Sequence, residues 1–257
     1  MSPTPEYDPE ATPFFFSGAA LDDIAEQHGG SYANADPFPH AVIDDFLPED
    51  VAEEVLAEFP DARNDEWIHR PPDHKYQQRK LKHYDEQTMG PVVRNVLSQF
   101  NSAAMIEFLE KVTGIDGLIP DPYYWGGGMH LIERGGFLKV HADFNWHEKL
   151  RLDRRVNLLL YFNKEWDESY GGHLELWNRE MSSCVKRVLP VFNRCVIFNT
   201  TDTSFHGHPD PIACPEGRNR KSLALYYYSN GRPASESAGK SRTTYKLRPG
   251  ESPYTPS

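Results

Sequence analysis

The sequence predicts a mostly β fold with helices (α+β), a double-stranded β-helix or jelly roll with helices packed on one sheet. After Pro122 the chain is a succession of about seven short apolar or alternating runs separated by turn residues, which is typical of a sandwich or barrel. Two stretches with helical periodicity precede these runs. They can supply the layer that covers one sheet.

With 257 residues the chain is long enough to bury a core without disulfide or metal staples. We expect three parts: a loosely ordered lead-in over residues 1–38, a single jelly-roll domain over 39–230 and a flexible tail over 231–257. The lead-in is expected to hold at most one short helix, around residues 21–27. Within the tail, TTYKL can dock as an extended segment.

The first elements of the domain follow Pro39, where HAVIDDF predicts a short strand. A helix is predicted to begin at Pro48 and to end at Pro60. Its apolar face consists of four residues, Val51, Val55, Leu56 and Phe59. Residues 61–90 are polar, rich in His, Arg and Lys, and contain a Pro-Pro pair, so a loop is expected there.

A second helical stretch is predicted from Pro91 to about residue 111, with a break at Asn101-Ser102 and an end at Gly114. The strand-like runs come next. They are YYWGGGMHLIE, FLKVHAD, RVNLLLYF, HLELWN, CVKRVLPV, RCVIFN and SLALYYYS.

Charge and cysteine content exclude several classes of protein. The formal net charge of −11 argues against a nucleic-acid ligand, because a phosphate backbone would be repelled. Cys184, Cys195 and Cys214 are odd in number and lack a CxxC spacing, which indicates free thiols in a reducing compartment. The first apolar run, Phe14 to Phe16, is too short for a signal or membrane segment. We therefore expect a cytoplasmic protein without a membrane partner; the oligomeric state is left open.

One His-x-Asp pair in an apolar strand is the first candidate for a metal site. His141 and Asp143 stand two apart in FLKVHAD, so their side chains project from one face of the strand. Two other pairs of this kind lie in the polar loop and in a proline-flanked turn: His83/Asp85 and His208/Asp210. The strand pair is preferred because a further histidine and then an arginine follow it on later strands.

His206, in TSFHGH after the strand RCVIFN, is the candidate third ligand, with His208 as its alternative. Two histidines and one carboxylate form the facial triad of non-haem iron(II) oxygenases, which leaves coordination positions open. Arg220 and Ser222 share one strand face, where a guanidinium and a hydroxyl can bind the far carboxylate of 2-oxoglutarate. Arg218 is the weaker alternative, because the residue two positions on is another arginine.

The order of these motifs resembles the prolyl 4-hydroxylase-like group of 2-oxoglutarate/Fe(II)-dependent dioxygenases. The order is His141-x-Asp143, then RVNLLLYFNKEWDESYGGHLELW, then SFHGHP, then Arg220-x-Ser222. The stretch YFNKEWDESYGGHLELW is similar to its counterpart in hypoxia-type prolyl hydroxylases. The resemblance spans about residues 39–230, including the opening FPHAVIDDFLPEDVAEEVL.

The resemblance implies a set of ligands and site residues. It implies His141, Asp143 and His206 as iron ligands and Arg220 as the 2-oxoglutarate anchor. It also implies Tyr161 within hydroxyl reach of the same carboxylate and Leu174 as an apolar wall, although Tyr161 can equally be a core aromatic. The implied cofactors are Fe(II), 2-oxoglutarate and O2, with ascorbate as an optional addition. Two departures, Leu131 in place of a tyrosine and the distinct stretch 145–154, concern the substrate rather than the chemistry.

The implied reaction is hydroxylation of a C–H bond, on a prolyl or other aminoacyl group or on a small metabolite, with release of succinate and CO2. Two other classes remain open at this point. One is a non-catalytic jelly-roll protein that binds a metal or ligand, and the other is a cupin-like metal enzyme without 2-oxoglutarate. Basic segments at 69–83 and 149–155 can attract an anionic substrate or can simply be solvated.

Overall fold

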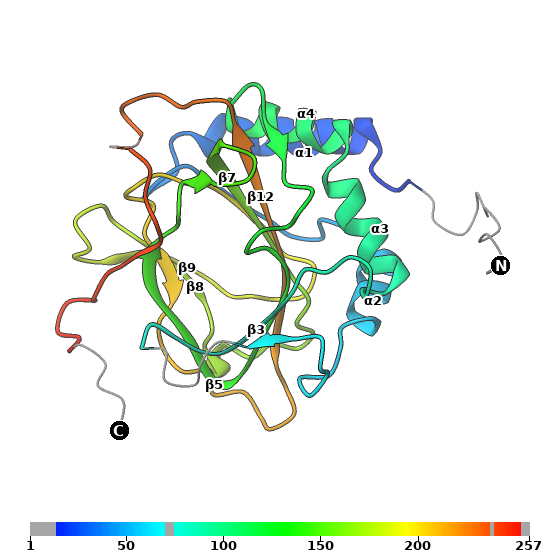
Figure 1. Ribbon diagram of the computed structural model, residues 1–257, viewed down its shortest axis with the longest axis vertical. Coiled ribbons are helices and arrows are strands. Elements are labelled where there is room, and N and C mark those ends of the chain that lie inside the picture. The colour runs from blue at the N-terminus through cyan, green and yellow to red at the C-terminus, as the bar shows by residue number, and fades with distance from the viewer. Residues whose placement is uncertain (1–13, 70–74, 237–238, 253–257) are drawn as a thin grey trace.

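The computed structural model describes residues 14–69, 75–236 and 239–252. Within these residues, thirteen strands, paired antiparallel, curl into a nearly closed barrel, and four helices lie along one side of it (Figure 1). The main path through the sheet is β1-β10-β7-β12-β5-β11-β8-β9. This architecture confirms the predicted double-stranded β-helix with helices packed on one sheet.

The helices are α1 (Gly18–Tyr32), α2 (Glu49–Ala57), α3 (Pro91–Phe100), α4 (Ala103–Thr113) and the short 3-10 helix η1 (Glu168–Tyr170). The strands before the midpoint of the chain are β1 (His40–Ile43), β2 (Ile68–His69), β3 (Gln77–His83), β4 (Ile119–Pro120) and β5 (Gly128–Ala142). The later strands are β6 (Trp146–His147), β7 (Leu152–Tyr161), β8 (Leu174–Trp177), β9 (Cys184–Val188), β10 (Cys195–Asn199), β11 (His206–His208), β12 (Arg220–Ser229) and β13 (Thr244–Tyr245).

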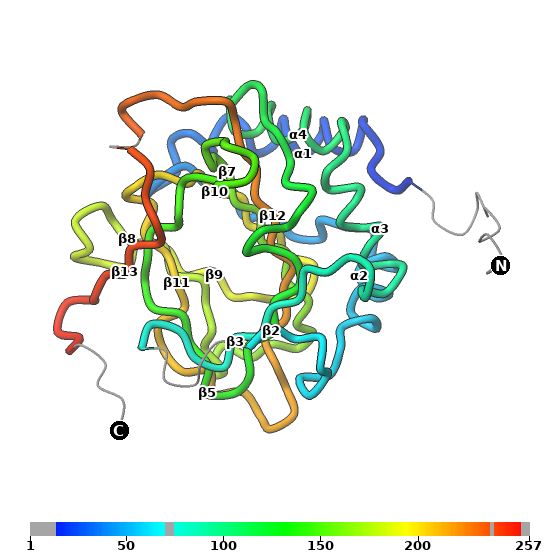
Figure 2. The backbone as a smooth tube through the Cα atoms, viewed as in Figure 1, coloured from blue at the N-terminus to red at the C-terminus, as the bar shows by residue number. Residues whose placement is uncertain are grey.

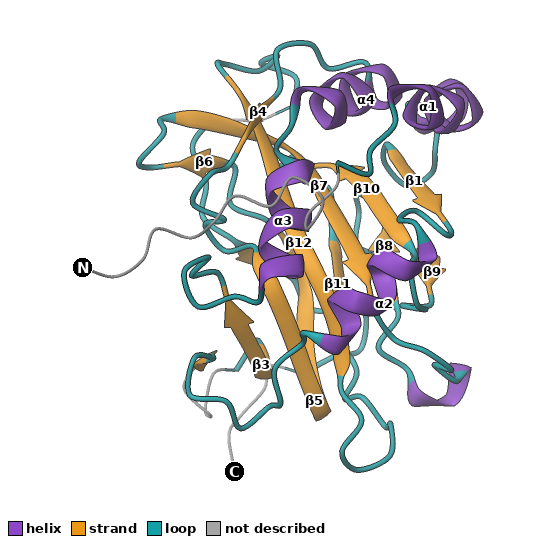
Figure 3. Ribbon diagram, turned by 90° about the vertical axis from the view of Figure 1, so that its right-hand side faces the viewer, coloured by secondary structure: helices purple, strands orange, loops and turns teal. Residues whose placement is uncertain are grey.

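The helices cover the outer face of the sheet that contains β10, β7 and β12 (Figure 3). Leu158 and Leu160 of β7 point outward into one core cluster with Val96 and Phe100 of α3. Residues at the alternate positions of β7, such as Asn157 and Leu159, face the barrel interior instead and line its cavity. The helix layer therefore buries one face of the sheet and leaves the other for a binding site.

The predicted break in the second helical stretch is confirmed. The Ser102 side chain accepts a hydrogen bond from the Met105 backbone N–H and caps α4. Gly114 ends this helix in the left-handed region, at a φ of 69° that glycine adopts without strain.

The prediction of a loop over residues 61–90 is wrong in its second half, where β3 pairs with β5. Gln77, Leu81 and His83 of β3 are buried, but only Leu81 is apolar. Because most buried positions of this strand are polar, the alternating hydrophobic pattern that reveals a strand is missing.

The helix predicted around residues 21–27 is longer in the structure, where α1 runs from Gly18 to Tyr32. Leu21, Ala25 and Tyr32 of this helix are buried in the main core cluster. A Cβ on Gly29 would lie 3.2 Å from the Lys111 carbonyl oxygen, so the glycine permits close packing of α1 on α4. Helix-disfavouring glycines near its end concealed the true length of α1.

The expected docking of TTYKL is confirmed, since β13 pairs with β5 at Ala142 and His141. Figure 2 shows this C-terminal segment passing along the left side of the barrel. The division into three parts with boundaries at 38/39 and 230/231 stays a prediction. In the described part of the chain, no helix has the length and apolarity needed to cross a membrane.

The predicted runs YYWGGGMHLIE and FLKVHAD contribute to one strand, β5, and a bulge separates them. In the β3–β5 ladder, Lys80 is opposite Ile132, whereas Gln78, two residues away in β3, is opposite Phe137, five residues away in β5. Four residues, 133–136, are thus looped out of the ladder. Ile132 and Leu138 line the same cavity on either side of the bulge.

Candidate active site

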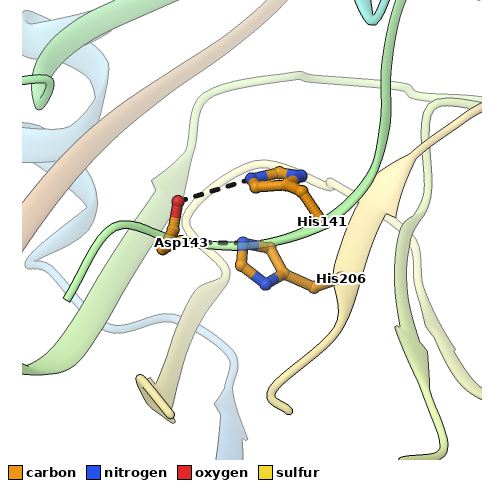
Figure 4. A group of neighbouring side chains, drawn as sticks. All are labelled: His141, Asp143 and His206. Atoms are coloured by element: carbon orange, nitrogen blue, oxygen red, sulfur yellow. Dashed lines mark ion pairs between the residues drawn. The ribbon is translucent and has the colours of Figure 1, made fainter. Parts of the chain in front are cut away.

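Three side chains from distant parts of the sequence meet inside the barrel (Figure 4). His141 near the end of β5 and His206 at the start of β11 are directly opposite in the ladder, with ring centroids 4.5 Å apart. The Asp143 carboxylate lies 3.4 Å from the Nε2 atom of each histidine. One ligand atom from each residue lies within 4.8 Å of the others, and this is the one such group found among the described residues. Two imidazoles and one carboxylate match the donor set of a facial iron(II) triad.

Both imidazoles are held by backbone carbonyls. His141 Nδ1 donates to the Lys139 oxygen at 2.8 Å, and His206 Nδ1 donates to the Ser204 oxygen at 2.9 Å. Because a carbonyl can only accept, these bonds fix the tautomer that leaves Nε2 available to a metal. Burial is the main cause that lowers the pKa of His141, which favours the neutral, metal-binding form.

Asp143 is oriented by two polar side chains of β7. Its Oδ2 atom accepts hydrogen bonds from Arg154 Nη2 at 2.9 Å and from Asn157 Nδ2 at 2.7 Å. Burial alone would raise the pKa of Asp143, but the charges of Arg154 and His206, together with hydrogen bonds from His141 and His206, hold this pKa well below its usual value. Arg154 is itself 1% exposed and stacks over the Tyr226 ring, 3.4 Å from the centroid. The basic segment 149–155 was expected to attract an anionic substrate or to be solvated, whereas Arg154 is buried and bonded to Asp143.

Replacing Arg154 by leucine is expected to weaken Mn(II) binding by roughly 10- to 100-fold, because the partners of metal-ligating groups have effects of this size. Titration of the metal-free protein with Mn(II) measures the change. Arg155→Leu is a matched control: Arg155 is also buried, but it bonds Ser229 and Glu236 rather than Asp143. Equal effects from both substitutions would contradict a specific role for Arg154.

Arg220 is a buried cation at the other end of the same cavity. Its Nε donates to the Gly172 carbonyl oxygen at 2.8 Å, and its Nη2 donates to the Tyr161 hydroxyl at 3.3 Å. Among the described residues it has no carboxylate partner, although it is only 4% exposed. A buried guanidinium without an anion is costly, so this arrangement indicates an anionic ligand.

The cavity brings together most of the residues that the sequence singled out. It has a volume of about 240 Å³. The predicted residues that line it are His141, Asp143, His206, Arg220, Ser222 and Leu174. Tyr161 lies behind Arg220, which it contacts, and its main environment is a core cluster with Leu174 and Phe198. Ser222 is directly opposite Tyr161 in the ladder between β12 and β7.

The alternative candidates lie elsewhere, with one exception. Arg218 donates to the carbonyl oxygens of Lys164 and Glu165, outside the cavity. The buried His83 ring lies 3.7 Å from a Glu66 carboxylate oxygen, also outside it. His208 is the exception, because it lines the cavity without belonging to the three-residue group.

Two departures from the family pattern have structural explanations. Leu131 is buried in the main core cluster, whereas its neighbours His130 and Ile132 line the cavity. In the stretch 145–154, Asn145 donates to the Gly239 carbonyl oxygen at 2.7 Å and accepts from the Ser241 N–H at 2.7 Å. This stretch therefore anchors the C-terminal segment beside the cavity.

Residues 127–228 match the model of the 2OG-Fe(II) oxygenase superfamily, and this range includes the triad and Arg220. Mouse prolyl 3-hydroxylase OGFOD1 is 26% identical over 229 residues, which cover 84% of this chain and 35% of that protein. The chain thus spans about a third of the length of this curated relative.

Two solved structures have the same fold. A prolyl hydroxylase from Trichoplax adhaerens, in complex with a peptide of hypoxia inducible factor, superposes with a TM-score of 0.59 at 16% identity, over 82% of this chain and 91% of that one. HygX from Streptomyces hygroscopicus, with nickel and 2-oxoglutarate bound, gives a TM-score of 0.52 at 12% identity, over 88% and 96%. Residues 127–228, which hold the triad and Arg220, thus resemble the 2OG-Fe(II) oxygenase superfamily, and the two solved structures show that the chain shares their fold.

Proposed function

We propose that this oxygenase hydroxylates a prolyl or other aminoacyl group within a polypeptide, converting 2-oxoglutarate to succinate and CO2. In this proposal His141, Asp143 and His206 hold Fe(II), while Arg220 and Ser222 hold the far carboxylate of 2-oxoglutarate. The observation that carries it is the buried Arg220, which lies in the same cavity as the triad and has no carboxylate partner among the described residues. The superfamily match does not favour the non-catalytic or cupin-like alternatives.

When bound, iron(II) and 2-oxoglutarate supply the activation of O2 that delivers one oxygen atom to a C–H bond. The chain's own residues bind and orient these groups, and they exclude water from the cavity. Arg154 and Asn157 fix the direction of the Asp143 carboxylate, as described above. Apolar side chains of the cavity wall keep the space around the reacting groups dry. They include Ile132, Leu138, Leu159, Leu174 and Phe198.

A groove that continues from the cavity supports a polypeptide rather than a small metabolite as substrate. It has a volume of about 770 Å³ and shares Trp125, Phe144, Thr243 and Tyr245 with the cavity lining. Its other walls include Trp146 and the C-terminal segment. An aromatic groove that extends beyond the reacting site can hold the residues that flank a target side chain. The named activity of OGFOD1 and the peptide bound to the Trichoplax enzyme add support.

Incubation with Fe(II), 2-oxoglutarate, O2 and a panel of proline-containing peptides tests this proposal, with and without ascorbate. We expect succinate formation together with a mass gain of one oxygen atom in a peptide. If succinate forms only with free metabolites, or if no substrate gains oxygen, the polypeptide assignment is wrong.

Trp125→Ala is expected to raise the KM for the peptide roughly tenfold and to leave the KM for 2-oxoglutarate unchanged, because the ring is an exposed part of the groove wall. Steady-state kinetics with each compound varied in turn measures both constants. Tyr123→Ala is the matched control, since Tyr123 is equally exposed but lies outside the groove. A rise in the 2-oxoglutarate KM would contradict this role for Trp125.

We further propose a cytoplasmic location, without a membrane or nucleic-acid partner. The support is the acidic net charge and three cysteines that form no disulfide.

A further inference from the structure

His208 is a buried histidine whose two ring nitrogens have no hydrogen-bond partner in the described structure. Residues two apart in a strand point to one face, and both His206 and His208 of β11 line the cavity. His206 belongs to the metal-ligand group, whereas His208 does not. The ring of His208 therefore lies at the cavity wall without a role as a metal ligand.

Gln77 is a second buried side chain with an unpartnered nitrogen, Nε2, in the same cavity. It is directly opposite Leu138 across the β3–β5 ladder, and His208 is opposite the same leucine across the β11–β5 ladder. The two polar side chains thus flank Leu138 at one level of the barrel. The cavity therefore has two unpartnered N–H donors at one level, on the two strands that flank β5.

This level is next to the one that holds Arg220. Arg220 is opposite Ile132 in the β12–β5 ladder, and the bulge at 133–136 makes Ile132 and Leu138 successive inward positions. Successive inward positions on a strand are about 7 Å apart. The guanidinium of Arg220 and the ring of His208 therefore border one compact space within a cavity of about 240 Å³.

No carboxylate of the described protein is placed to accept from these donors. Asp143 is the one acidic residue in the cavity lining, and its Oδ2 atom already accepts from Arg154 and Asn157. Buried N–H groups without acceptors are unfavourable, so their presence around one space indicates a ligand that brings acceptors. A carboxylate offers about four acceptor sites, more than the fork of one arginine occupies.

We propose that His208 and Gln77 are additional anchors of 2-oxoglutarate, donating N–H bonds to the far carboxylate that Arg220 binds. The inference rests on the proposed function, in which this carboxylate occupies the Arg220 end of the cavity. A dicarboxylic cosubstrate would then be held by a charged fork and by two neutral donors from the strands on either side of Leu138.

Binding of two 2-oxoacids to Mn(II)-loaded protein without O2 tests the proposal, measured by calorimetry. One is 2-oxoglutarate, and the other is 2-oxopentanoate, which has the same carbon chain but lacks the far carboxylate. His208→Leu is expected to weaken 2-oxoglutarate binding roughly 10- to 100-fold, the effect of losing a hydrogen bond to a charged group, and 2-oxopentanoate by less than about twofold. Gln77→Leu should act in the same direction, and His208→Gln, which keeps a donor, should recover part of the affinity.

The outcomes separate this inference from the proposed function. Unchanged 2-oxoglutarate binding in both leucine variants would mean that only water satisfies these donors, and equal weakening of both acids would mean a general loss of packing; either result overturns the proposal. If the unsubstituted protein binds 2-oxoglutarate no better than 2-oxopentanoate, the proposed function itself fails. Unchanged Mn(II) affinity and an unchanged thermal transition show that a variant is folded with its metal site intact.

Discussion

Replacement of His141 by alanine is expected to abolish Mn(II) binding and succinate formation together. The substitution removes one of only three proposed protein ligands, and its effect should exceed the roughly 10- to 100-fold expected from loss of an outer partner such as Arg154. His206→Ala is expected to have the same consequence, because the two rings face one another across the β5–β11 ladder. Metal titration and a succinate assay measure the two effects on one preparation.

His208→Ala is the control for this experiment, because it removes another buried histidine of the same cavity and the same strand. It should leave Mn(II) affinity within about threefold of the unsubstituted protein, a difference below 1 kcal/mol. Loss of Mn(II) binding in His208→Ala but not in His206→Ala would show that the third ligand has been misassigned.

Arg220→Leu is expected to raise the 2-oxoglutarate concentration needed for half-saturation by roughly 100- to 1,000-fold while Mn(II) affinity stays unchanged. Truncating one partner of a buried, hydrogen-bonded charge pair typically costs about 2–5 kcal/mol, and a 100- to 1,000-fold change, about 3–4 kcal/mol, lies within that range. The half-saturating 2-oxoglutarate concentration of Arg220→Lys should lie between those of the unsubstituted protein and Arg220→Leu, because an ammonium keeps the charge but not the planar fork. Binding isotherms with 2-oxoglutarate measure the shift.

The same substitution should have an unusual effect on the ligand-free protein. Arg220 is buried without an anionic partner among the described residues, so leucine should leave the free energy of unfolding unchanged or increase it. Added 2-oxoglutarate should raise the melting temperature of the unsubstituted, Mn(II)-loaded protein and have little effect on Arg220→Leu. A large loss of stability in the ligand-free variant would indicate that Arg220 is structural.

The jelly roll and its triad were predictable because their signals are periodic or carried by few residues. The main strands are short apolar runs between turn residues. His141 and His206 are polar residues within such strands, and Asp143 directly follows one of them. Their chemistry as a set, followed by Arg220, selected one His-x-Asp pair among three. The superfamily match confirmed the class of enzyme, and the roles of the individual residues stay predictions.

The parts that could not be predicted depend on contacts between distant segments. Strand β3 has polar inward residues because it borders a polar cavity, so its sequence resembles a loop. Arg154 looks like a surface charge until Asp143 and Tyr226 are placed around it. Nothing local in the sequence indicates that Gln77 and His208 flank one leucine, since that follows from two separate strand registers.

The attachment of β13 bears on when the metal site can mature. At His141 the strand β5 is flanked by β11 on one side and by β13 on the other, and the Tyr245 ring lies 5.5 Å from the His141 ring. During synthesis on the ribosome, the first two proposed ligands emerge about a hundred residues before this last neighbour. Their strand keeps an open edge until residue 245 has been made and has paired with it, so stable iron capture should follow synthesis of this segment.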